Sequence, residues 1–172
     1  ITMLFTFLFG GNLLRKLGWG KTALITPIML LVTGVAFFAF IIFKGSLTNA
    51  IAMIGSTPLM LAVMIGMIQN IATKSSKYSF FDPTKEMAYI PLDQEQKVKG
   101  KAAVDVVGAR LGKMGGSLIN GGLIIAFGSI GAITPYIAAL LFVIIGVWIL
   151  AAKSLNKQFL ARSTEKDEQI AK

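Results

Sequence analysis

Long apolar segments alternate with shorter polar ones along this chain. The continuously apolar stretches are residues 1–14, 23–43, 50–72, 108–130 and 134–152. A helix needs roughly 20 apolar residues to cross the hydrocarbon core of a bilayer, so each stretch after the first has the length of a span. We expect the first to be the end of a span that begins before this sequence. Because the stretches do not alternate between apolar and polar residues, they predict an all-α, polytopic transmembrane helical bundle and disfavour membrane strands.

Prolines near the starts of these stretches indicate where the helices begin. Pro27 and Pro58 lie early in their stretches, where a proline starts or kinks a helix. Thr134 followed by Pro135 predicts an N-cap and a first helical residue, because the missing N–H of proline costs nothing in the first turn. The last helix is therefore expected to begin at this Thr-Pro pair.

The polar segment 74–101 separates the third apolar stretch from the fourth. An Asp-Pro pair at 82–83 predicts a helix start and a short helix over 84–90. Asp93 is expected to cap a second helix, with Gln96 in the capping-box position, that continues toward the fourth stretch. We expect the segment to lie at the membrane surface, either as a connector that fixes the geometry of two spans or as a gate.

Basic residues are concentrated in alternate connections between the apolar stretches. Two connections have few basic residues: one contains Lys44 alone, and the other, around Gly131, contains none. The rich ones carry Arg15, Lys16, Lys21, Lys74, Lys77, Lys85, Lys97, Lys99 and Lys101, and the tail adds Lys153, Lys157, Arg162, Lys166 and Lys172. By the positive-inside rule, the rich connections and the C-terminus are cytoplasmic. This topology accounts for the net charge of +9 without nucleic acid as a partner.

The composition narrows the chemistry that the chain can perform. Hydrophobic residues make up 55% of the sequence, more than in an ordinary soluble domain. There is no cysteine and no histidine, so thiolate ligands, the commonest metal ligand and the commonest general base are absent. The GKT at 20–22 lacks the first glycine of a P-loop, because that position is Arg15. We therefore expect no enzyme activity, no bound metal and no cofactor.

The fourth stretch carries polar residues and glycines on different sides. On a helical wheel the polar residues fall within a stripe about 80° wide, and the glycines cluster nearly opposite. The stripe comprises Arg110, Lys113, Ser117 and Asn120, and the glycines are Gly108, Gly112, Gly115 and Gly122. We expect the glycine side to pack closely on a neighbouring helix. A cation within an apolar span normally faces a polar interior, so Lys113 either points into a pathway or extends to the cytoplasmic headgroups.

A few other polar residues are candidates for function. Gln69 and Asn70 lie about one turn from the cytoplasmic end of the third stretch, where they either contact a ligand or bond to a neighbouring helix. Of the acidic residues, Asp105 alone is placed to enter a pathway. Lys101 precedes it by four residues and is expected to pair with it on the helix surface.

Three segments of this chain resemble a known family of carriers. KSSKYSFFDPTKEMAYIPLD, followed by KVKGKAAVDVVGARLGKMGGSLI, resembles the signature region of the nucleotide transporters called ATP/ADP translocases, which occur in chlamydiae, rickettsiae and plastid inner envelopes. GGNLLRKLGWGKTALITP resembles the basic loop and following helix of the same family. The likeness covers nearly the whole chain except the tail after about Asn156.

The resemblance implies a fold similar to the C-terminal half of a major-facilitator-type transporter. Residues 1–152 would be the end of helix 8 through helix 12 of a twelve-helix carrier, with a cytoplasmic loop at 74–101 and a cytoplasmic tail at 153–172. Lys113 matches the lysine of the family's LGKxGG segment, which implies that it helps bind nucleotide phosphates, and Met114 stands where the family often has serine. The candidate substrate-binding residues are Lys113, Arg110, Asn120, Asn70 and Gln69.

The function expected from the resemblance is the movement of nucleotides across a membrane by alternating access, as ATP/ADP exchange. Proton-driven uptake of nucleotides or of another organic anion by the same fold is an alternative, and so is a non-transporting membrane subunit. The expected partners are ATP and ADP as substrates, the lipid bilayer and the missing N-terminal half of the carrier. We expect the chain in a bacterial inner membrane, with the plastid inner envelope as the alternative.

Overall fold

The computed structural model describes residues 11–43, 45–46, 55 and 57–170. The elements are α2 (Gly11–Ile42), α4 (Pro58–Ser76), the π-helix η2 (Lys77–Phe81), α5 (Asp82–Ala88), α6 (Gln94–Lys101), the π-helix η3 (Ala102–Gly108), α7 (Ala109–Phe127) and α8 (Ile130–Ile170). The described residues form no strand, which confirms the predicted all-α class. Most of the predicted span 1–14, and the start of the one at 50–72, lie outside the described residues.

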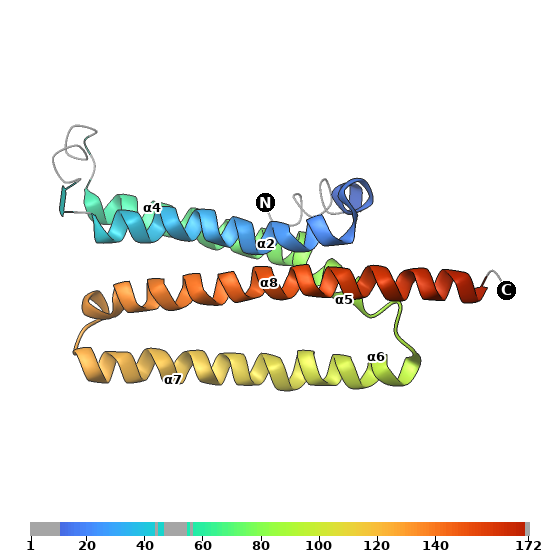
Figure 1. The fold of residues 1–172 in the computed structure, drawn as a ribbon. Helices are drawn as coiled ribbons and strands as arrows, with labels where there is room; N and C mark the ends of the chain where they lie inside the picture. Colours follow the sequence, from blue (N-terminus) through green and yellow to red (C-terminus); the bar gives the residue numbers. More distant parts are fainter. Residues whose placement is uncertain (1–10, 44, 47–54, 56, 171–172) are drawn as a thin grey trace.

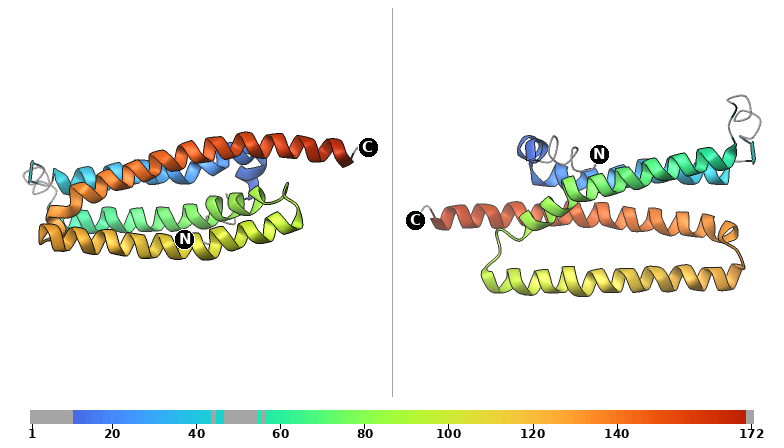
Figure 2. Two further views of the ribbon diagram at one scale, coloured as in Figure 1. Left: turned by 60° about the horizontal axis from the view of Figure 1, so that its bottom comes forward. Right: turned by 180° about the vertical axis from the view of Figure 1, so that it is seen from behind.

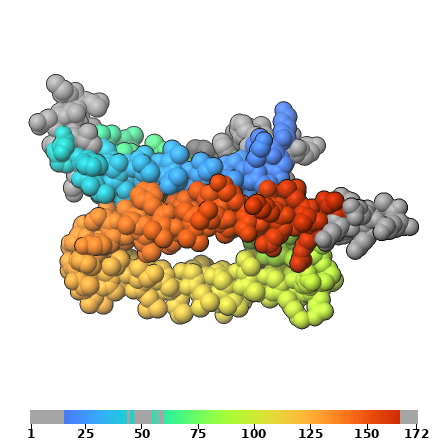
Figure 3. Space-filling view, viewed as in Figure 1, coloured from blue at the N-terminus to red at the C-terminus, as the bar shows by residue number. Residues whose placement is uncertain are grey.

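The long helices lie side by side in an open arc, in the order α4, α2, α8, α7. Helix α2 packs against both α4 and α8, and α7 packs against α8. Figure 1 shows α2 and α4 on one side of α8 and α7 on the other, and the space-filling view in Figure 3 shows the same layers. The view from behind in Figure 2 shows α4 and α7 as the two ends of the arc, with α8 between them. In the described part of the chain, α4 and α7 form no packed interface.

Helix α2 contains a break close to its beginning. Gly18 has a φ of 73° and a ψ of 171°, a backbone conformation that glycine adopts without a steric penalty. The Thr22 hydroxyl donates a hydrogen bond to the Gly18 carbonyl at 2.8 Å, one turn back along the chain. Pro27 lies inside the helix beyond this point and is fully buried. The break in the helical dihedral angles therefore falls at Gly18 and not at Pro27.

Helix α4 begins at a proline and continues without interruption into α5. Thr57 caps α4, with its hydroxyl oxygen accepting from the Met60 N–H at 3.2 Å, and Pro58 is the first helical residue. The chain then passes through η2 into α5, which begins at Asp82 with Pro83 in its first turn, so this boundary lies at the predicted Asp-Pro pair. The helix is continuous across the boundary, because residues 81 and 82 already have helical dihedral angles, and α5 ends at Ala88 and not at residue 90. The wider π-helical turn just before Pro83 accommodates the ring and the missing N–H.

Helix α6 begins where the sequence predicts. The Asp93 carboxylate accepts a hydrogen bond from the Gln96 backbone N–H at 2.7 Å, and the helix runs on through η3 into α7. The Gln96 side chain does not complete the capping box: its carbonyl oxygen accepts from the Arg162 guanidinium at 3.2 Å. The predicted cap is confirmed, and its glutamine joins α6 to the far end of α8.

Helix α8 begins four residues before the predicted Thr-Pro pair. Gly128, with a φ of 77°, ends α7, and the Ser129 hydroxyl then accepts from the Ala132 N–H at 3.3 Å. Thr134 is inside the helix, where its hydroxyl donates to the Ile130 carbonyl at 2.9 Å. The predicted cap at Thr134 is wrong because the serine after the α7 terminator caps the helix first. The helix continues past residue 152 to Ile170.

Within the described residues, two helical segments are long and apolar enough to cross a membrane, namely Lys16–Ile42 and Ile130–Thr164. Many large apolar side chains on α7 and α8 are exposed, among them Leu118, Ile125 and Leu150. The start of α2, the helices α5 and α6, and the end of α8 gather at one end of the molecule, and the α7–α8 turn lies at the other (Figure 1). The basic segments therefore share one end, as the alternation of charge in the sequence requires.

Candidate functional site

The predicted site residues lie on the two helices at the ends of the arc. Gln69 and Asn70 are on α4, and Arg110, Lys113 and Asn120 are on α7. Because α4 and α7 form no packed interface in the described part of the chain, the structure does not bring the two groups together. They remain two separate candidate surfaces on α4 and α7, the helices at the two ends of the arc (Figure 2).

The side chains predicted on α7 are all exposed. Lys113 makes no hydrogen bond or ion pair with the residues that the structure describes, and Arg110 and Asn120 are exposed beside it on the same helix. Within one turn before Arg110 the chain leaves the π-helix η3, a rare conformation that occurs often at functional sites. The Lys113 ammonium, exposed and unpaired among the described residues, is therefore available to bind an anion.

The glycine side of α7 is open in this chain. A Cβ atom built at Gly112, Gly115 or Gly122 would meet no atom of the described residues within 4 Å. The close helix contact predicted for this side is therefore not made among the described residues. At Gly108 a Cβ would lie 3.4 Å from the Ala103 carbonyl oxygen, which belongs to the adjoining π-helix.

A groove of about 430 Å³ lies between α2 and α4 and includes both polar residues predicted on α4. Gln69 is half-buried in it and Asn70 is exposed. The other side chains that line the groove are Leu30, Phe37, Thr73 and Lys74. Sequence reasoning did not select Thr73 and Lys74, although their spacing of three and four residues from Asn70 puts them on the same helix face. No spacing along the sequence could have pointed to Phe37, because it lies on α2 and not on α4.

Ion pairs join α5 to the helix that leads into α7. The Lys85 ammonium lies 2.7 Å from an Asp105 carboxylate oxygen, and Lys101 pairs with Glu86. The predicted pair between Lys101 and Asp105 is wrong, because α5 lies alongside and supplies a partner to each. The hydrogen bond to Asp105 raises the pKa of Lys85 above its usual value, and partial burial of the ammonium opposes this shift.

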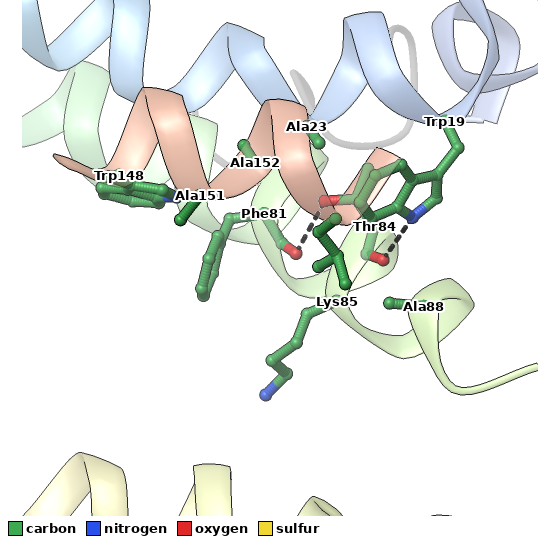
Figure 4. Close-up of a pocket in the computed structure, with 10 residues that line it drawn as sticks. Trp19, Ala23, Phe81, Thr84, Lys85, Ala88, Trp148, Ala151 and Ala152 are labelled. Atoms are coloured by element: carbon green, nitrogen blue, oxygen red, sulfur yellow. Dashed lines mark hydrogen bonds between the residues drawn. The ribbon is translucent and has the colours of Figure 1, made fainter. Parts of the chain in front are cut away.

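A tryptophan connects α2 to α5 and α8 at the same end of the molecule. The Trp19 indole N–H donates to the Thr84 carbonyl at 2.8 Å, and its ring stacks on Phe159 at 5.0 Å. Figure 4 shows Trp19, Phe81 and Trp148 around a mainly apolar pocket of about 250 Å³, with the Lys85 ammonium directed away from it. The pocket offers few polar groups, so its contribution is packing of these elements.

The described residues thus form an all-helical protein of the membrane-carrier type by composition, with two helices long and apolar enough to span a bilayer, a basic end and two polar surfaces. Residues 1–159 match the family described as TLC ATP/ADP transporter. The chain belongs to this family, which confirms the resemblance recognised in the sequence. No solved structure matches it.

Curated relatives of the chain include carriers from bacteria and plants. It is 60% identical to ADP,ATP carrier protein 1 of Chlamydia trachomatis over 99% of this chain and 33% of the relative. It is 57% identical to ADP,ATP carrier protein 1 of Chlamydia pneumoniae, again over 99% of this chain and 33% of the relative. It is 54% identical to the chloroplastic ADP,ATP carrier protein 1 of Arabidopsis thaliana over 92% of this chain and 25% of the relative. The chain thus spans a third or less of the length of these relatives, and their names describe carriers and not enzymes.

Proposed function

We propose that this chain is part of a secondary transporter that exchanges ATP for ADP by alternating access. The relatives named as ADP,ATP carriers support this proposal, and so does membership of the transporter family. The observation that carries it is Lys113, an exposed ammonium without a partner among the described residues, in the GKMGG segment of α7. A lysine is a compact point charge on a flexible stem, which suits a phosphate that must be released again.

The proposed place of the chain in the carrier is the last part of its C-terminal half. Residues 1–152 are the end of helix 8 through helix 12, residues 74–101 face the cytoplasm, and 153–172 form a cytoplasmic tail. The open arc supports this assignment, because α4 and α7 expose apolar and polar faces that other helices of a larger bundle would cover. The fold of the complete carrier is proposed to be similar to that of the major facilitator superfamily, with the two halves rocking around a shared site.

The two candidate surfaces are proposed to bind the substrate from both sides of the open part of the arc. Lys113 and Arg110 on α7 contact the phosphates, and Asn120 donates to the substrate from the same helix. Gln69 and Asn70 on α4 contact the base or ribose. A carrier of a polyanion needs such cations in a cavity, and it must bind the substrate without holding it irreversibly.

Counterflow of labelled nucleotide tests the proposed exchange. Vesicles of bacterial inner-membrane lipid are loaded with ADP and contain the complete carrier, and uptake of labelled ATP is measured with and without a proton gradient. Exchange predicts uptake that depends on internal ADP and is insensitive to the gradient. Uptake that requires the gradient and no internal nucleotide would identify proton-driven transport instead.

A further inference from the structure

The groove between α2 and α4 has walls of different chemistry. The α4 wall is polar and carries Gln69, Asn70 and Thr73, with Lys74 at its end in the last turn of the helix. The α2 wall is apolar, with Leu30 and Phe37. A volume of about 430 Å³ is within the range of roughly 300 to 1,000 Å³ that small-molecule sites occupy.

The polar groups of the groove are unoccupied by other parts of the described chain. The side chains of Asn70, Thr73 and Lys74 make no hydrogen bond or ion pair with the residues that the structure describes. Lys77, one turn beyond, differs: its ammonium lies 2.8 Å from the Asp82 carboxylate and over the ring of Tyr78. Lys74 is thus an available cation where its neighbour is already neutralised.

The aromatic ring of the opposite wall is held in place. A Cβ atom at Gly66 would lie 3.3 Å from the Cε2 atom of Phe37, so the glycine leaves room for the ring against α4. Phe38 packs edge-on against Phe37, with ring centroids 5.3 Å apart. An aromatic ring and amide groups that line the same groove are an arrangement to which a planar heterocycle binds by stacking and hydrogen bonding.

We propose that this groove binds a nucleotide, with Phe37 against the base and Lys74 on a phosphate. The inference rests on the proposed function and extends it by two residues that the sequence did not select. A lipid headgroup would offer the same phosphate to Lys74 but no base to Phe37. Dependence on both residues therefore distinguishes a nucleotide from a lipid.

The test is equilibrium binding of labelled ATP to the complete carrier in vesicles, with inorganic pyrophosphate as a competitor that has no base. Lys74→Gln is expected to weaken the binding of ATP and of pyrophosphate by about tenfold each, because one charge-assisted hydrogen bond is lost. Phe37→Leu is expected to weaken the binding of ATP by about tenfold and to leave the binding of pyrophosphate unchanged, because only the stacking contact is lost. Lys74→Arg retains the charge and should keep most of the affinity.

Matched variants outside the groove serve as controls. Lys77→Gln removes a paired lysine from the same end of the molecule, and Phe43→Leu removes an exposed ring from the end of α2. Equal amounts of inserted protein with unchanged melting temperatures are compared. If the Lys74→Gln protein binds ATP as tightly as the Lys77→Gln protein does, the groove is not the nucleotide site. The same conclusion follows if Phe37→Leu weakens the binding of pyrophosphate as much as the binding of ATP. Parent protein that neither binds nor exchanges nucleotides would instead overturn the proposed function.

Discussion

At the residue scale, the proposed phosphate contact rests on a single ammonium on α7. Lys113 is exposed and unpaired among the described residues, and it lies in one of the segments that resemble the family. Lys113→Ala in the complete carrier should weaken ATP and ADP binding by roughly 2 to 4 kcal/mol, as expected when one partner of a desolvated charge pair is removed. Lys113→Arg should restore part of the affinity, because the planar guanidinium needs more space and binds phosphate bidentately. Equilibrium binding and exchange of labelled nucleotide measure both effects.

The control for this variant is a lysine on a different helix. Lys153 is exposed on α8, and Lys153→Ala should leave binding within experimental error of the parent. Wild-type binding by the Lys113→Ala carrier would show that this side chain extends to the lipid headgroups and that other cations hold the phosphate.

Residues whose roles are set within one helix were predictable from sequence, and residues that act between helices were not. Asp93 caps α6 as its local pattern indicates. Asp105 was expected to pair with Lys101 four residues earlier, but it pairs with Lys85. Phe37 joins the groove only because α2 packs against α4. Periodicity describes neighbours on one helix, and it contains no information about which helix lies alongside.

At the scale of elements, two ion pairs join α5 to the continuous helix formed by α6, η3 and α7. Lys85→Glu should place two carboxylates together and destabilise the carrier by up to about 1 kcal/mol, since the pair is only partly buried. Adding Asp105→Lys to this variant restores an opposite-charge pair and should recover most of the loss. Melting temperatures in detergent at low salt measure both variants.

The matched control for this pair stays within α6. Lys99 pairs with Glu95 inside that helix, and both side chains are 76% exposed. Lys99→Glu should therefore change the melting temperature less than Lys85→Glu does. A double variant no more stable than Lys85→Glu alone would show that the ion pair does not join the two elements.

The boundaries of elements followed local signals where one signal acted alone. Pro58 starts α4 because Thr57 is extended and its hydroxyl caps the first turn. The Thr-Pro pair at 134–135 does not start α8, because Ser129 already provides a cap next to the glycine that ends α7. The Asp-Pro pair at 82–83 lies at the start of α5, but it does not separate α5 from the preceding helix, because the π-helix η2 runs directly into it. Where two such signals lie within a few residues of each other, the pattern alone does not say which of them begins the helix.

At the scale of the whole molecule, the all-α class was easier to predict than the order of the helices in space. Apolar length and charge alternation predict helices that run back and forth, and the structure places the basic segments at one end (Figure 1). The arc α4, α2, α8, α7 follows from contacts between residues far apart in sequence. The glycine side of α7 meets nothing within the described residues, so the close helix contact expected for it stays a prediction. We likewise propose that the two candidate surfaces form one site in the complete carrier.

The basic end of the molecule is expected to face the cytoplasm, and this orientation is testable because the chain has no cysteine of its own. Single cysteines replacing Lys16 or Lys99, in an otherwise cysteine-free complete carrier, should react with a membrane-impermeant maleimide only from the cytoplasmic side. A cysteine replacing Gly131, in the first turn of α8 at the opposite end, should react only from the outside. The sidedness follows from the excess of Lys and Arg at one end, which sets orientation during insertion. Reaction of the Lys99→Cys carrier from the outside would show that the orientation is the reverse of the predicted one. Lys74 and Lys85 would then lie at the external face.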